Sequence, residues 1–149
     1  MKIREIRGNI SRHMKQLSFL FIILLFVSCN ETETSGNGDL DGYWKLIAID
    51  TLATGGTHDL MENQVFWAVQ HKLITMAGYA FRFEKTDETL TLYDGYLYQT
   101  DSIHPGIDNI ERLAIYGIHQ QPETFSIDKL NNRHMTLSNT DYRLNFKKF

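Results

Sequence analysis

The chain has 149 residues, with 15 basic and 18 acidic side chains and a formal net charge of −3. Without residues 1–28 the balance becomes 10 basic against 17 acidic residues, a net charge of −7. So acidic a domain is a poor candidate for nucleic-acid binding, which needs basic patches that neutralise phosphates, and we expect no nucleic-acid partner.

Residues 1–28 have the layout of a secretory signal peptide. Five basic residues and one acid precede a mostly apolar run over residues 17–27. As a helix this run would rise about 16 Å, roughly half the hydrocarbon core of a bilayer, which is too short for a membrane span. Translation from Met14 instead of Met1 would leave a compact signal, and both starts remain open.

The signal ends in Phe26-Val27-Ser28-Cys29, which resembles the bacterial lipobox, in which a small residue precedes a cysteine that becomes acylated. The resemblance implies a lipid on Cys29 and a place in the bacterial cell envelope. We expect an outer-membrane lipoprotein, on either the periplasmic or the surface face. Phe26 stands where leucine is commoner. Because Cys29 is the only cysteine, it has no partner for an intramolecular disulfide.

Residues 30–39 contain no apolar side chain, so they cannot bury enough surface to offset the entropy of ordering. We therefore expect an acylated cysteine and flexible linker over residues 29–40. Residues 41–149 are expected to form one domain with a single, modest core.

Period-two alternation dominates this domain and predicts antiparallel strands. Alternating runs at 79–83, 89–93, 125–128, 135–138 and 142–147 are separated by polar turns at 86–88, 131–132 and 139–141. Earlier strands are expected at 42–50 and 65–75, and residues 96–100 are expected to continue the sheet after a turn at Asp94-Gly95. Such a series is typical of a barrel or a sandwich.

Two regions interrupt the alternation. Residues 51–63 are polar and are expected to form a long loop. Residues 105–117 are ambiguous: Asp108 and Glu111 have the spacing of a capping box, whereas Leu113 and Ile115 fit a strand equally well. A short helix or turn that leads into irregular chain is favoured there.

Gly42-Tyr43-Trp44, at the start of the first predicted strand, resembles the opening signature of lipocalins. With the later strands, residues 40–149 resemble the Bacteroidetes lipocalin-like lipoprotein family. The resemblance implies an all-β fold, a small antiparallel up-and-down barrel with at most one short helix. It also implies a structural signature of Gly42, Trp44 and Arg143, in which the arginine covers the tryptophan at one end of the barrel.

Aromatic residues supply the candidate ligand contacts. An eight-stranded barrel is either filled by its own side chains or holds one small molecule. Tyrosine suits a wet cavity mouth or a partner surface, although ordinary sheet packing uses it as well. The candidate ligand-binding residues are Trp67, Tyr79, Phe81, Tyr93, Tyr96 and Tyr98.

The sequence carries little sign of catalysis. The histidines after residue 28 show no short metal-ligand spacing, and no nucleophile elbow or phosphate-binding glycine loop is present. We expect no catalytic residue, no metal and no cofactor. The one enzymatic alternative is a hydrolase-like site near His104, three residues after Asp101.

Two functions remain open. In the first, the barrel binds a small apolar or amphipathic ligand. In the second, a side-chain-filled barrel is a non-enzymatic accessory subunit of a cell-envelope complex. The expected partners are the membrane, through the lipid on Cys29, and either a small hydrophobic ligand or an envelope protein.

Overall fold

A computed structural model describes residues 35–149 except 100–101 and 108. The predicted signal peptide, Cys29 and the first part of the linker lie outside the described residues. The strands are β1 (Gly42–Thr51), β2 (Gly56–Asp59), β3 (Phe66–Gln70), β4 (Leu73–Met76), β5 (Tyr79–Lys85), β6 (Thr89–Gln99), β7 (Ser102–Pro105), β8 (Glu123–Leu130), β9 (His134–Ser138) and β10 (Tyr142–Lys148). Two 3₁₀ segments accompany them, η1 (Gly38–Leu40) and η2 (Ile110–Tyr116).

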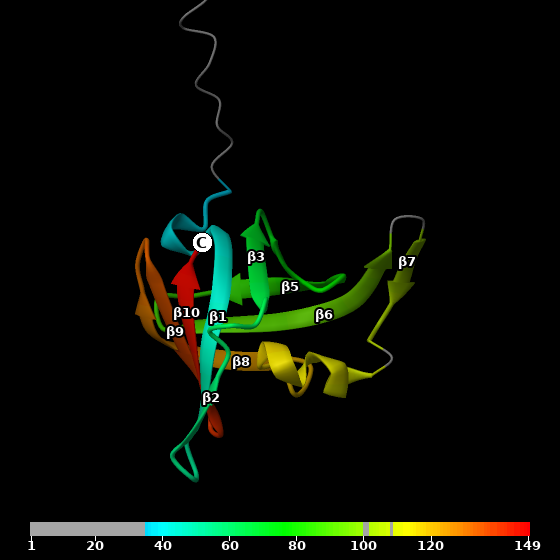
Figure 1. The fold of residues 1–149 in the computed structure, drawn as a ribbon. Helices are drawn as coiled ribbons and strands as arrows, with labels where there is room; N and C mark the ends of the chain where they lie inside the picture. The colour runs from blue at the N-terminus through cyan, green and yellow to red at the C-terminus, as the bar shows by residue number, and fades with distance from the viewer. Residues whose placement is uncertain (1–34, 100–101, 108) are drawn as a thin grey trace, which may run out of the picture. The chain divides into compact units, whose positions relative to one another are not determined.

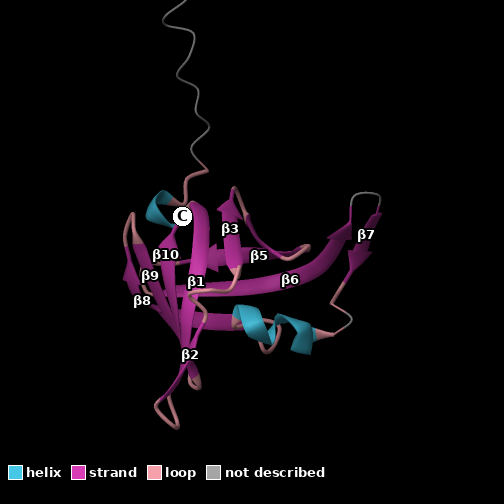
Figure 2. Ribbon diagram, viewed as in Figure 1, coloured by secondary structure: helices cyan, strands magenta, loops and turns pink. Residues whose placement is uncertain are grey.

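The strands form one antiparallel sheet that closes on itself (Figure 1, Figure 2). Neighbouring strands run in the order β1–β3–β4–β5–β6–β8–β9–β10, and pairing of β10 with β1 completes the ring. β2 pairs with the second half of β1, and β7 pairs with the end of β6. Ring closure decides between the barrel and the sandwich, and the all-β barrel prediction is confirmed.

Three details of the predicted strands are wrong. Residues 65–75 form two strands, because His71 has a positive φ of 54° and the chain turns there. Residues 51–63 contain β2, so that they form a hairpin with β1 instead of a long loop. Asp94-Gly95 is no turn, since β6 runs through it without interruption.

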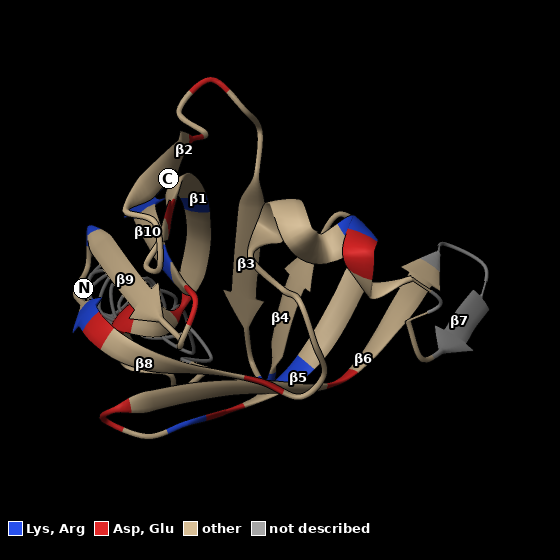
Figure 3. Cartoon of the chain, turned by 90° about the horizontal axis from the view of Figure 1, so that it is seen from below, with Lys and Arg blue, Asp and Glu red and all other residues tan. Residues whose placement is uncertain are grey.

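The two 3₁₀ segments lie at opposite ends of the ring (Figure 1). η1 follows the first described residues, and its Leu40 is completely buried. η2 lies at the other end, beside β3 and β6 when the domain is seen from below (Figure 3). The expected short helix in residues 105–117 is confirmed, but Asn109 is its N-cap, because its side chain accepts a hydrogen bond from the Glu111 amide. Asp108 lies outside the described residues.

Apolar side chains fill the middle of the ring. Trp67 on β3 packs against Phe125 on β8 and Phe146 on β10, with ring centroids 6.1 and 4.9 Å apart. All three side chains are at most 1% exposed, so no water molecule fits beside them. Burial of this apolar surface is the main force that holds the ring closed.

The amino-terminal end of the domain is more ordered than the sequence predicts. Asn37 Nδ2 donates to the carbonyl of His71 over 2.6 Å and to Asp41 Oδ1 over 2.7 Å. The prediction of a flexible linker as far as residue 40 is therefore wrong for residues 35–40.

No helix in the described part of the chain is long and apolar enough to cross a bilayer.

Candidate functional site

An irregularity in β6 places two of the candidate tyrosines on one face. The register between β5 and β6 passes from Arg82↔Tyr93 to Ala80↔Tyr96, so that two residues of β6 stand opposite one residue of β5. Residues three apart in a regular strand point to opposite faces. The extra residue of this β-bulge, with φ of 48° at Asp94, turns Tyr93 and Tyr96 to the same outward face.

The outward face of β4, β5 and β6 is hollowed beside these tyrosines, with a volume of about 640 Å³. Leu73, Arg82 and Tyr93 are direct cross-strand neighbours there, on the face opposite to the buried Ile74 and Leu92. The hollow is lined by His71, Lys72, Leu73, Arg82, Phe83, Tyr93 and Tyr96. Its walls are therefore apolar and aromatic, with basic groups at the β3–β4 turn and on β5.

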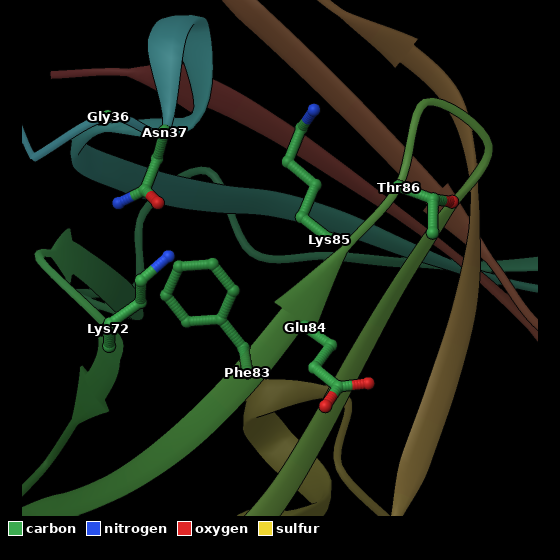
Figure 4. A pocket seen from close by; sticks show the side chains of 7 residues that line it. All are labelled: Gly36, Asn37, Lys72, Phe83, Glu84, Lys85 and Thr86. Carbon is green, nitrogen blue, oxygen red and sulfur yellow. The ribbon is translucent and has the colours of Figure 1, made fainter.

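A second hollow, of about 420 Å³, adjoins the first and shares Lys72 and Phe83 with it. It lies between the amino-terminal segment and the end of β5, where Asn37 and Lys72 face Lys85 and Thr86 across Phe83 (Figure 4). Its lining is more polar than that of the first hollow. Neither Lys72 nor Arg82 forms a salt bridge with a carboxylate among the described residues.

The six candidate ligand-binding residues separate into three groups. Trp67 and Phe81 are completely buried in the core, where a ligand cannot reach their side chains. Tyr79 packs against that core, and Tyr98 is 43% exposed on β6. Tyr93 and Tyr96 line the hollow of about 640 Å³.

Trp44 is covered by a different cation from the predicted one. Trp44 is completely buried, and its Nε1 donates to the carbonyl of Leu40 over 2.7 Å. The Lys148 ammonium lies 4.8 Å from the centroid of its ring. Arg143 pairs with Asp128 instead, 3.5 Å away, so the prediction that Arg143 covers Trp44 is wrong. The reason is register: Trp44 stands opposite Lys148, whereas Arg143 stands opposite Asp50.

Gly42, the remaining member of the signature, has a φ of 118° and lies close to the Lys148 side chain. A Cβ at this position would approach Lys148 Cε to 2.9 Å. Glycine therefore lets the chain enter β1 while Lys148 reaches across Trp44.

The alternative of a hydrolase-like site near His104 stays a prediction, because Asp101 and the His104 side chain lie outside the part of the chain that the structure describes. The ring of His119 is stacked on Tyr142, with centroids 4.4 Å apart, and His104 belongs to β7. No group of three His, Cys, Asp or Glu side chains between residues 35 and 149, as far as they are described, is placed to hold a metal ion.

One buried acid escaped the sequence analysis. Glu123 is 2% exposed, and its carboxylate accepts hydrogen bonds from the amides of His119 and Gln120 and from Asn139 Nδ2. These three donors compensate for the loss of water around a buried charge. Glu123 therefore fixes the chain between η2 and β8, which is a structural role.

The basic and apolar lining around residues 71–73 and 82 was also missed. His71 and Lys72 fall inside the range predicted as one strand, and Leu73 looks like a strand residue of no particular role. The polar triplet Gln70-His71-Lys72, which interrupts an otherwise apolar run, is the signal that would have indicated a turn there.

Comparisons with known proteins give one family and a consistent fold. The sequence profile of a family described as a lipocalin-like domain matches residues 24–149. A crystal structure of a lipocalin-like protein from Bacteroides uniformis is 16% identical, with a TM-score of 0.58 over 75% of this chain and 100% of that one. An uncharacterised protein from Bacteroides eggerthii is 14% identical, with a TM-score of 0.55 over 73% of this chain and 98% of that one. No curated protein matches.

Proposed function

Because this chain belongs to the lipocalin-like domain family, we propose that it is a lipid-anchored envelope protein that binds a small amphipathic ligand. The observation that carries the proposal is the hollow of about 640 Å³ beside Tyr93 and Tyr96. Sites for small molecules commonly have volumes of roughly 300–1,000 Å³ and apolar walls with a few polar groups. We assign the ligand to this outward face because Trp67, Phe81 and Phe125 are completely buried in the interior.

The lining indicates what kind of molecule would fit. Leu73, Tyr93 and Tyr96 offer apolar and aromatic surface to an apolar body. Arg82 and Lys72 offer cations to an anionic group, and a guanidinium binds a carboxylate or phosphate through two parallel hydrogen bonds. We therefore propose a ligand with an apolar body and one anionic end, such as a fatty-acid-like molecule. The proposal includes no catalytic step.

Binding is tested by displacement of a fluorescent fatty acid from the domain of residues 30–149, which contains the whole ring and core. Arg82→Gln should weaken binding about tenfold or more, because a charge-assisted hydrogen bond contributes roughly 1.5–3 kcal/mol. Tyr96→Ala should weaken it by a similar factor through lost apolar contact.

Two exposed positions outside the lining serve as controls for this experiment. Arg143→Gln and Tyr98→Ala change the same residue types on β10 and β6 and should leave the affinity within a factor of about two, since neither side chain lines the hollow. A flat response of the parent domain to probes with and without an acidic group would contradict ligand binding.

The second candidate function is that of an accessory subunit of an envelope complex. The completely buried Trp67, Phe81 and Phe125 favour it, because a filled barrel has no interior ligand site. Recovery of one envelope protein in stoichiometric amount with the acylated chain, together with a negative displacement assay, would support this candidate instead.

A further inference from the structure

Three aromatic residues gather on the outside of the barrel where β1 begins. The rings of Tyr43 and Phe66 have centroids 5.3 Å apart, and that of Phe149 lies 5.4 Å from Phe66 and 6.5 Å from Tyr43. Tyr43 is 50% exposed and Phe149 is 85% exposed. We call these three residues the aromatic cluster. Clustered exposed apolar side chains of this kind mark a surface that is covered by a partner or a membrane.

A row of basic residues crosses the neighbouring strands. Lys45 on β1 stands directly opposite Lys147 on β10, and Lys147 stands opposite His134 on β9. Lys45 and Lys147 are like charges that face each other across the sheet, which is unfavourable for stability. The Lys45 ammonium donates to the carbonyl of Met61 over 2.6 Å, which leaves its positive charge without a counterion in that contact. Lys45 also stands opposite Phe66 of the aromatic cluster. The cluster and the basic row are therefore adjacent on one outward face, in a domain whose residues 35–149 carry ten basic and fifteen acidic side chains.

The chain enters the domain at this same end. Asn37 is bonded to the β3–β4 turn, and Lys148 Nζ donates to the carbonyl of Asp39 over 2.9 Å. Ser35, the first described residue, follows Cys29 by six positions. In any conformation those residues reach at most about 22 Å. β1 alone, with ten residues, is about 33 Å long, so only the end that carries η1 and the aromatic cluster can lie close to an acylated Cys29.

We propose that the aromatic cluster and the Lys45–Lys147 row form a membrane contact that rests on anionic lipid headgroups of the leaflet that holds the Cys29 anchor. Aromatic rings at the level of the headgroups, flanked by lysines whose stems lie along apolar surface, are the chemistry of a membrane interface. The contact relies on the lipid anchor of the proposed function for its nearness to the bilayer. It assigns the domain one orientation on the membrane.

The first test uses the acylated full chain in vesicles of phosphatidylglycerol and bromine-labelled phosphatidylcholine. A tryptophan reporter is introduced by Phe149→Trp, and the matched reporter by Ile115→Trp, which is exposed on η2 at the other end. Trp44 and Trp67 are completely buried and give the same background in both variants. We expect the Phe149→Trp fluorescence to be quenched about threefold more strongly, because bromine quenches an indole only at short range and the proposed contact puts position 149 at the membrane interface. Equal quenching of the two reporters overturns the contact.

The second test separates the contact from the anchor. The unacylated domain of residues 30–149 should float with vesicles that contain phosphatidylglycerol and less with phosphatidylcholine alone. We expect two variants to lower the fraction of the domain that floats with the vesicles about fivefold or more. One is the double change Tyr43→Ser, Phe149→Ser, and the other is the single change Lys147→Glu. The control changes Leu52→Ser, in the β1–β2 loop, and Lys129→Glu, on β8, should leave it unchanged.

Each other outcome has a defined meaning. Failure of the parent domain to float with either vesicle, or equal loss in the control variants, overturns the membrane contact. If the double change instead converts a dimer to a monomer and leaves flotation unaltered, a second copy of the chain is the occupant, and the proposal is wrong. If the exported chain carries no lipid on Cys29 while the unacylated domain still floats, the contact stands and the anchor is overturned.

Discussion

Gly95 is the residue on which the shape of the candidate site depends most directly. A Cβ at this position would approach Phe81 Cε1 to 2.5 Å and Ile107 Cδ1 to 2.6 Å. With its amide oxygen toward β6, Gln121 accepts hydrogen bonds from the amides of Gly95 and Asp94, at 2.7 and 3.2 Å. The irregular backbone that turns Tyr93 and Tyr96 to one face is thus held from inside the domain, and only glycine leaves room for it.

Gly95→Ala should lower the free energy of unfolding by about 1–3 kcal/mol, because overpacking of a well-packed interior forces side chains and backbone apart. Gly56→Ala in the exposed β2 is the matched control and should change it by less than about 0.5 kcal/mol. Urea denaturation followed by tryptophan fluorescence measures both. Equal stability of the two variants would show that the bulge tolerates a side chain.

At the scale of elements, the amino-terminal segment is fastened to the β3–β4 turn and to the end of β10. Partial burial raises the pKa of Asp41, but hydrogen bonds from Ser35 and Asn37 and the positive charge of Lys148 outweigh it and leave the pKa below its ordinary value. Because the folded pKa is lowered, the ionised carboxylate stabilises the attachment above the ordinary pKa. That stabilisation is lost as the pH falls through the lowered value.

We therefore expect the segment to detach at strongly acidic pH before the barrel unfolds. The side-chain amide resonances of Asn37, followed by NMR during acidification, should move toward those of a free asparagine, while the indole resonance of the buried Trp67 stays in place. Asp41→Asn should remove the pH dependence of the Asn37 resonances. If the Asn37 amide and Trp67 indole resonances move together at the same pH midpoint, the whole domain unfolds in acid and the segment does not detach first.

For the molecule as a whole, the two 3₁₀ segments lie over the two ends of the closed ring. η1 and Trp44 cover one end, and η2 covers the other through the buried Leu113 and a hydrogen bond of 3.1 Å from Trp67 Nε1 to Tyr116. The hollow beside Tyr96 and the aromatic cluster are both on outward faces. The proposed ligand site and the proposed membrane contact therefore use different outward surfaces of one domain.

The lipid anchor is itself a prediction about the whole molecule. Cys29→Ser should abolish labelling of the exported chain by radioactive palmitate, because no other cysteine exists to carry a thioether-linked lipid. Ser28→Thr, which keeps a small polar residue beside Cys29, serves as the control and should retain labelling. Labelled protein after Cys29→Ser would refute the assignment.

The sequence by itself determined the all-β class, most strand positions and the family resemblance, because alternation of apolar and polar residues encodes locally which side of a strand is buried. Residues 142–147 are an example: Leu144 and Phe146 are buried as their alternation predicts. The turns at 86–88 and 139–141 followed in the same way from their short polar residues.

Only the tertiary structure decided which cation covers Trp44, which tyrosines share a face and where the outward face is hollowed. Lys148 and Trp44 are far apart in sequence, and their meeting depends on the register between β1 and β10. Tyr93 and Tyr96 share a face through a bulge that is held by Gln121 from another part of the chain. The alternation of a single strand carries no information about register with a distant strand, and the site is built from such registers.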